Sequence, residues 1–136
     1  MDIIQAYKNT HYKTESGFTL HVDSRAPELD ELLSNSGLNA AIFITAWNPF
    51  SEVKSDIENK ELNNQLRDDL LDLTSEGNII PGFGEDPTGE WPGEESFLVL
   101  GISREMGINL SRKYRQNAFV FHELGAKTEL ILTLVE

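Results

Sequence analysis

The segment from Ala40 to Ala46 is the feature that most limits how this chain can fold. It is apolar at both odd and even positions, and Thr45 is its only hydroxyl residue. A strand with one wet face would alternate apolar and polar residues, because successive side chains point to opposite faces of a sheet. An almost unbroken apolar run therefore predicts an interior strand, buried on both faces, around which the rest of the domain is built.

Four other segments carry apolar residues every three to four positions and are predicted to be helices: 2–8, 27–36, 55–76 and 104–115. Residues typical of helix ends support three of these boundaries. Pro27 is tolerated in a first helical turn, and Ser55 with Glu58 has the Ser-x-x-Glu form of a capping box. Gly77 is placed to end the longest helix.

The remaining apolar or alternating segments are predicted to be strands: 10–14, 18–22, 40–46, 78–80, 97–102, 118–123 and 128–135. A short turn at Gly17 joins the first two strands as a β-hairpin, and a short turn at Gly125 joins the last two. Hairpins among helices argue against a purely parallel, doubly wound sheet. We therefore expect an α+β domain with a mixed β-sheet of about five to seven strands and three to four packed helices. The alternative is a three-layer α/β arrangement.

Length and composition set the broad class. The 136 residues suffice for a single domain, 1–136, and 39% hydrophobic residues are ordinary for a globular protein. The absence of Cys excludes disulfides, thiolate nucleophiles and Cys-based zinc sites. The first residues lack a signal-peptide pattern, and no apolar stretch reaches the length of a membrane helix. A cytoplasmic domain that does not enter a membrane is the simplest interpretation.

The net charge of −12 disfavours nucleic acid as a partner, because the field of the protein repels phosphate. Four basic residues near one predicted helix are the exception: Arg104, Arg112, Lys113 and Arg115. We interpret them as solvated charges that balance acidic neighbours.

Several strings of the sequence together match a known pattern. They include Ala6-Tyr7 with Thr10 and Tyr12, Thr45-Ala46-Trp47-Asn48-Pro49, Asn59, Pro81-Gly82-Phe83-Gly84, Trp91, Glu94 to Val99 and Gln116-Asn117-Ala118. With them the chain resembles, over nearly its whole length, a bacterial family named domain of unknown function 3293. The resemblance implies a self-contained bacterial domain. It implies no activity, so it brings no catalytic residue and no cofactor.

Trp47 and Asn48 follow directly after the predicted interior strand and are the first candidate site residues. Ligands tend to bind where loops and helix N-termini gather beyond strand ends. There Trp47 could stack on a flat ligand, and Asn48 could donate and accept hydrogen bonds. The structural alternative is that Trp47 closes the core and Asn48 bonds the turn before Pro49.

The segment 81–96 is predicted to be a long loop, and long ordered loops are often functional. Its Gly-Phe-Gly string has neither phosphate-binding spacing, and the loop is rich in carboxylates that would repel phosphate. Trp91 is a candidate ligand contact within it. The alternative is that Trp91 packs against the body of the domain and anchors the loop.

Glu94 and Glu95 precede a buried strand, so burial could raise the pKa of one of them into a range useful for proton transfer. The acids of this segment could also bind Mg²⁺ or Ca²⁺, but their spacing matches no calcium loop. Solvated surface acids are therefore the default interpretation. No metal site is predicted, and the three histidines fit no zinc pattern.

Gln116 and Asn117 lie between the last predicted helix and a strand. Amides at such a junction commonly cap helix carbonyls, and ligand contact is the alternative.

Two functions remain open. The first is a small-molecule-binding domain, able to be an enzyme, with a pocket lined by Trp47, Asn48, Trp91, Glu94, Gln116 and Asn117. The second is a non-enzymatic module that binds a protein partner through the acidic 55–76 helix or an exposed sheet edge. The second predicts buried Trp47 and Asn48 and no concave pocket. Neither the ligand nor a reaction or cofactor is assigned by the sequence.

Overall fold

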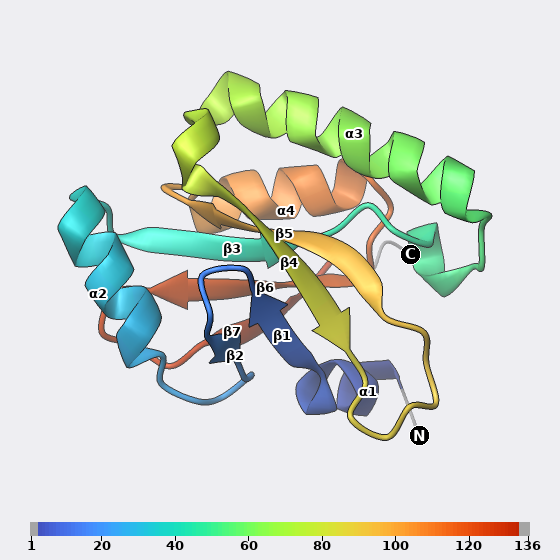
Figure 1. The fold of residues 1–136 in the computed structure, drawn as a ribbon, viewed down its shortest axis with the longest axis horizontal. Coiled ribbons are helices and arrows are strands. Elements are labelled where there is room, and N and C mark those ends of the chain that lie inside the picture. The colour runs from blue at the N-terminus through green and yellow to red at the C-terminus, as the bar shows by residue number, and fades with distance from the viewer. Residues whose placement is uncertain (1–2, 134–136) are drawn as a thin grey trace.

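The computed structural model describes residues 3–133 and has one seven-stranded sheet with helices on both faces (Figure 1). The helices are α1 (Ile3–Asn9), α2 (Pro27–Ser36), α3 (Asp56–Leu73) and α4 (Arg104–Lys113), with short 3-10 helices η1 (Pro49–Ser51) and η2 (Glu76–Asn78). The strands are β1 (His11–Thr14), β2 (Thr19–Leu20), β3 (Ala40–Ile44), β4 (Ile79–Glu85), β5 (Glu94–Leu100), β6 (Ala118–Glu123) and β7 (Glu129–Leu132).

The strand order is β2-β1-β4-β5-β3-β6-β7, and every pairing between these strands is antiparallel. The predicted α+β class is confirmed. Within this class, the expectation of a mixed sheet is wrong, because no two neighbouring strands of the sheet run parallel within residues 3–133. The sheet is strongly twisted, so that β1 and β4 run steeply across the direction of β3 (Figure 1).

The prediction of an interior strand is confirmed, although the strand ends at Ile44 rather than at Ala46. β3 lies between β5 and β6. Ala41 and Phe43 belong to the core cluster on the α2 side, while Ile42 and Ile44 belong to the cluster beneath α3 and α4. Apolar residues at every position are needed because both faces of this strand are covered.

The helices therefore make a layer on each face, with α2 on one side and α3 and α4 on the other (Figure 1). This is the layering of the three-layer alternative, but the antiparallel sheet keeps the α+β class. α4 approaches the sheet closely at Gly107, where an added Cβ would lie 2.5 Å from the Phe119 ring.

The segment predicted as one long loop, 81–96, is half sheet, so the predicted length of the loop is wrong. Residues up to Glu85 belong to β4, β5 begins at Glu94, and the loop is 86–93. Proline and glycine are rare inside strands, which is why the sequence reads as loop. Gly82 is needed there because an added Cβ would lie 2.7 Å from the Phe43 ring and 2.9 Å from the Lys13 carbonyl oxygen.

Other boundaries differ only at their ends. The helix predicted over 2–8 runs from Ile3 to Asn9, and residue 2 lies outside the described part of the chain. The last predicted strand, 128–135, is β7 over Glu129–Leu132, and positions 134–135 are likewise outside it. Across 3–133 no helix has both the length and the apolar character needed to cross a membrane.

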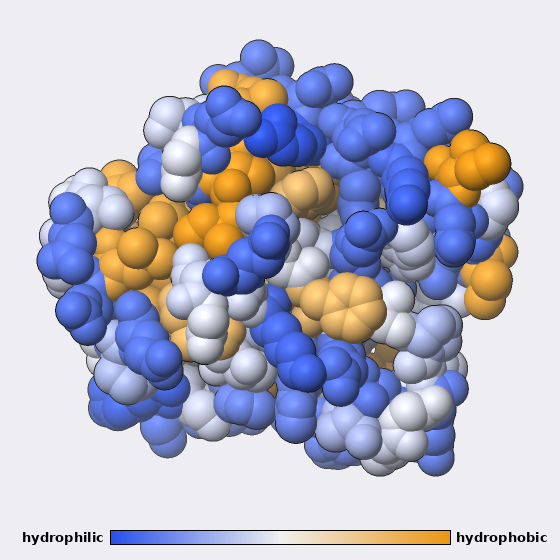
Figure 2. All heavy atoms as spheres, viewed as in Figure 1, coloured by the Kyte–Doolittle hydropathy of each residue, from blue (hydrophilic) through white to orange (hydrophobic). Residues whose placement is uncertain are grey.

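Most of the surface in view is hydrophilic; the widest apolar area lies in the left half, between α2 and β4, and smaller apolar groups lie at the right-hand end, over the segment between η1 and α3 (Figure 1 and Figure 2). Phe50, Val53 and Ile57 are all exposed there.

Candidate functional site

A cavity of about 320 Å³ opens between α1, the 86–93 loop and the end of β3. The antiparallel pairing explains its position. The C-terminal end of β3 lies beside the N-terminal halves of β5 and β6, with Ile44 opposite Phe97 and Phe43 opposite Val120. The segments that precede β5 and β6 therefore meet the segment that follows β3, at the same end of these three strands. The cavity lining combines aromatic and aliphatic side chains with a few polar ones: Tyr7, Thr10, Tyr12, Phe43, Ile44, Asn48, Ser51, Val53, Asp86, Trp91, Glu94, Ser96, Gln116, Phe119, Val120 and Leu130.

The structure brings four of the six predicted site residues to the cavity wall: Asn48, Trp91, Glu94 and Gln116. Trp47 does not line it; its side chain is 9% exposed and belongs to the interior. Asn117 lies behind the wall, where its Nδ2 donates to Ser51 Oγ at 3.2 Å. For these two residues the geometry favours the structural alternative, and ligand contact by the other four stays a prediction.

Asn48 is held in a left-handed backbone conformation, with φ of 46°. Its backbone N–H donates to Asn59 Oδ1 at 2.8 Å, and Asn59 Nδ2 donates to Asn48 Oδ1 at 2.7 Å. The Lys54 N–H also donates to Asn48 Oδ1. Phe50 and Ser51 have positive φ as well, which is uncommon for residues other than glycine. Surrounding hydrogen bonds thus fix a strained turn at the cavity mouth.

Asn63, one turn further along α3, fastens the exit of β3 to β5. Its Oδ1 accepts from the Ala46 N–H at 2.8 Å, and its Nδ2 donates to the Glu95 carbonyl at 2.9 Å. Asn59 and Asn63 are both buried on the long helix. Sequence reasoning did not single out Asn63, although a polar residue at an inward-facing helical position was the available signal.

Gln116 connects the two sides of the cavity floor. Its Nε2 donates to the carbonyl oxygens of Trp47 at 3.2 Å and Tyr114 at 3.3 Å. The same side chain lines the cavity, and no group within 3–133 donates to its Oε1. Gln116 therefore has a structural role through its nitrogen and an available acceptor through its oxygen.

Glu94 is the principal titratable group of the cavity. Burial raises its pKa to about 7. No hydrogen bond or ion pair to its carboxyl group is found among the described residues, and burial is the sole cause of the shift. The adjacent Glu95 is exposed because successive strand residues face opposite sides. The default interpretation of solvated acids is thus wrong for Glu94.

Tyr7 and Tyr12 close the cavity from the side of α1. The Tyr12 hydroxyl donates to the Tyr7 carbonyl at 2.7 Å, and Thr10 Oγ1 donates to the Ala6 carbonyl at 2.7 Å. Burial raises the pKa of Tyr7, although hydrogen bonds from Ser51 and Asn117 act in the opposite direction. Neither tyrosine was predicted as a site residue, because the pattern of a short helix and a hairpin does not indicate that the two elements share a cavity.

Asp86 organises the loop that carries Trp91. Its carboxylate accepts from the backbone N–H groups of Thr88 at 2.9 Å, Glu90 at 3.0 Å and Trp91 at 3.1 Å. These bonds lower the pKa of Asp86, with the Thr88 N–H contributing most. Trp91 lines the cavity and is still 53% exposed, so it forms part of the cavity entrance rather than a sealed wall.

The cavity lining within the described residues contains carboxyl groups but no Lys, Arg or His. Two of the basic residues noted in the sequence pair with acids, Arg104 with Glu129 at 2.6 Å and Lys113 with Asp69 at 2.7 Å. His122 is buried against Asp30, on the α2 side. In residues 3–133 no three His, Asp or Glu side chains gather closely enough to hold a metal ion.

A family model described as "Protein of unknown function (DUF3293)" matches residues 44–119, more than half of the chain. The match begins at the end of β3 and ends in β6, so it includes the loop and the Gln116 junction. No curated protein and no solved structure matches the chain.

Proposed function

Since the chain belongs to the DUF3293 family, which supplies no activity to transfer, we propose from the cavity itself that the domain binds a small organic molecule. The bound molecule would contact Asn48, Trp91, Glu94 and Gln116, with Tyr7 beside them. The observation that carries this proposal is a cavity whose walls are mostly apolar and whose few polar groups come from separate elements.

The size and composition of the cavity support this proposal. Its volume of about 320 Å³ lies at the lower end of the range for sites that hold small molecules, roughly 300–1,000 Å³. Aromatic rings would supply apolar contact area, and the small number of polar groups would fix orientation. A molecule about as large as one or two aromatic rings fits these dimensions.

The cavity favours a binding domain over the alternative of a protein-interaction module. That alternative expects Trp47 and Asn48 to be buried scaffold with no concave pocket nearby. Trp47 is indeed interior, but Asn48 lines a cavity. The net charge of −12 and the lack of cations in the described lining also argue against nucleic acid.

Glu94 gives the same site a capacity for acid–base chemistry. A carboxyl group with a pKa of about 7 exchanges its proton near neutral pH, which is what a general acid or base needs. Binding comes first in the proposal because a reaction requires a positioned substrate, and the cavity supplies the position.

A fragment screen by two-dimensional NMR tests the proposal. Neutral, cationic and anionic fragments are added to the ¹⁵N-labelled protein, and we expect shifts of the Glu94, Ser96 and Ala118 amides. Ala6→Phe should weaken every hit at least about tenfold, because Ala6 lines the cavity and the added ring would fill it. Ile4→Phe on the same helix is the matched control, since Ile4 is outside the lining. A screen with no hit at these amides, or hits indifferent to Ala6→Phe, would contradict the proposal.

A further inference from the structure

The charged side chains that line the cavity are all acidic within the described residues. Its described lining holds the carboxyl groups of Glu94 and Asp86, and no side chain that carries a positive charge. The field of the whole chain, with a net charge of −12, has the same sign. An anionic ligand would enter against both, whereas a cation would be attracted by both.

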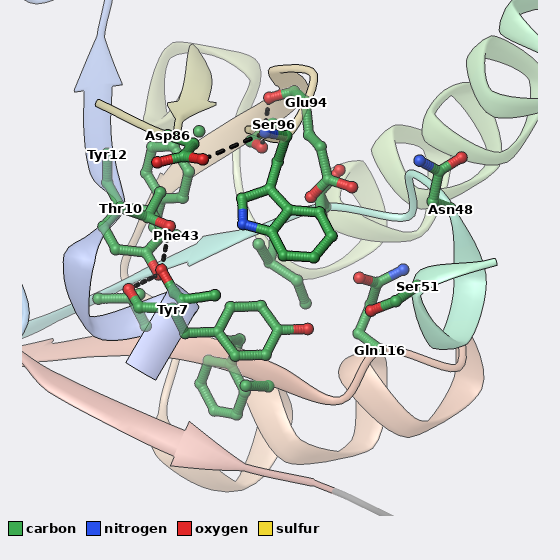
Figure 3. Close-up of a pocket in the computed structure, with 18 of the residues that line it drawn as sticks. Tyr7, Thr10, Tyr12, Phe43, Asn48, Ser51, Asp86, Glu94, Ser96 and Gln116 are labelled. Atoms are coloured by element: carbon green, nitrogen blue, oxygen red, sulfur yellow. Dashed lines mark hydrogen bonds between the residues drawn. The ribbon is translucent and has the colours of Figure 1, made fainter. Parts of the chain in front are cut away.

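The groups without partners are mainly acceptors. Neither the Glu94 carboxyl nor Gln116 Oε1 receives a hydrogen bond from any group in 3–133, and the Gln116 nitrogen is already used by two carbonyls. In Figure 3 the Glu94 carboxyl, the Gln116 amide and the Tyr7 hydroxyl point toward the same space. A ligand that donates several hydrogen bonds from one end would satisfy these acceptors.

The walls suit an apolar body behind that donor end. Tyr7, Tyr12, Phe43, Phe119 and Trp91 contribute aromatic rings to the lining. Rings pack well against a flat apolar group, and their faces also attract a cation.

We infer that the ligand carries a positively charged nitrogen, of the amidinium or ammonium kind, on a flat aromatic body. Its nitrogen lies at Glu94 and Gln116, and its body lies among the rings of Tyr7, Phe43 and Trp91. This inference rests on the proposed function, since it names the chemical class that the same cavity takes.

The state of Glu94 supports the assignment. A carboxyl group that burial holds near a pKa of 7 is poorly stabilised when ionised, and a cation in contact with it supplies the missing stabilisation. The other titratable groups facing the cavity are Tyr7 on α1, Tyr12 on β1 and Asp86 in the loop. Burial raises the pKa of both tyrosines, so they stay neutral near pH 7 and offer no competing positive or negative charge.

Three probes of the same shape separate the possibilities: benzamidine, benzamide and benzoate, which are cationic, neutral and anionic at pH 8. Each is titrated into the ¹⁵N-labelled protein while the Glu94, Ser96 and Ala118 amides are followed. We expect benzamidine to bind at least about tenfold more tightly than benzamide, and benzoate to cause no shift at these amides. An amidinium can donate two parallel hydrogen bonds to one carboxylate, as a guanidinium does.

Glu94→Gln should remove the preference, so that benzamidine binds no better than benzamide. Glu95→Gln, which changes the same charge at the neighbouring exposed position, should leave it intact. Both variants change the net charge by the same amount, so Glu95→Gln controls for long-range electrostatic effects. Retained amide dispersion in both spectra shows that the variants are folded.

The outcomes separate this inference from the proposed function. Equal or tighter binding of benzamide or benzoate at the cavity amides overturns the cationic ligand and leaves a binding cavity. The cationic ligand is likewise overturned, and the cavity kept, if all three probes fail while only neutral or anionic fragments of the screen shift these amides. If the whole screen fails as well, both the inference and the proposed function are overturned.

Discussion

The side chain of Asn59 forms two hydrogen bonds with Asn48, accepting from its backbone N–H at 2.8 Å and donating to its side-chain oxygen at 2.7 Å. Asn59 is buried on α3, and Asn48 lies in a left-handed conformation on the cavity wall. A helix on one face of the sheet thereby fixes the shape of a site that opens at the ends of the central strands. Residues outside the cavity lining, such as Asn59, should therefore affect the shape of the site.

Asn59→Ala is expected to destabilise the domain by about 2 kcal/mol, because it leaves the Asn48 N–H without its buried partner. Urea denaturation measures this change. Asn64→Ala on the same helix is the control; Asn64 is exposed, and we expect a change within about 0.5 kcal/mol. Equal stability of the two variants would show that the Asn48 turn holds without Asn59.

Two glycines should respond oppositely to alanine. At Gly82 the added Cβ meets the Phe43 ring at 2.7 Å and the Lys13 carbonyl at 2.9 Å, so Gly82→Ala should lose about 1–3 kcal/mol. At Gly77 nothing lies within 4 Å, and Gly77→Ala should be neutral or slightly stabilising. Thermal unfolding of both variants tests the pair. A harmless Gly82→Ala would contradict the close contact of β4 with Phe43.

Glu94 should make stability fall as pH rises. Its folded pKa of about 7 is above the ordinary value of 4.5, so between these values the folded state keeps a proton that the unfolded chain has lost. Glu94→Gln lacks this penalty. The free energy of unfolding of the variant, relative to that of the wild type, should therefore rise by about 2 kcal/mol from pH 5 to pH 8. Urea denaturation at both pH values gives the difference.

The matching control is Glu95→Gln, whose stability relative to the wild type should change little between the same pH values, since its side chain is exposed. If the Glu94→Gln and wild-type profiles ran parallel, Glu94 would be ionised in the fold at an ordinary pKa. The absence of a partner for its carboxyl would then need another explanation.

The sequence predicted the framework of the site because that framework depends on hydrophobic pattern. The apolar run at Ala40–Ile44 identified the interior strand, and strand ends next to helices indicated where Asn48, Glu94 and Gln116 would meet. The sequence left the place of Trp47 open, because an indole after a strand fits a core position and a binding position equally well. Only its packing, with 9% exposure, separates the two.

The sequence could not say which of Glu94 and Glu95 faces the cavity. A shift of one residue in strand register moves every side chain to the other face. Here the register follows from pairing with β4, including Gly84 opposite Glu94, in a segment whose proline and glycines read as a loop. Tyr7 was missed for a related reason. Its helix has the expected position in the chain, but only the assembled fold places that helix against the cavity.

Binding of a cation at Glu94 should itself depend on pH, with the opposite sign to the effect on stability. A cation binds the ionised carboxylate, and near pH 6 most of the free protein has a protonated Glu94 because its pKa is about 7. Benzamidine stays protonated over this range, so its affinity should rise about tenfold between pH 6 and pH 8 and then level off. Calorimetry at pH 6 in buffers of different ionisation enthalpy should show release of close to one proton, and Glu94→Gln should abolish both effects. An affinity that falls as pH rises would mean that the neutral acid is the binding form, and that Glu94 donates a hydrogen bond to its ligand instead of pairing with a charge.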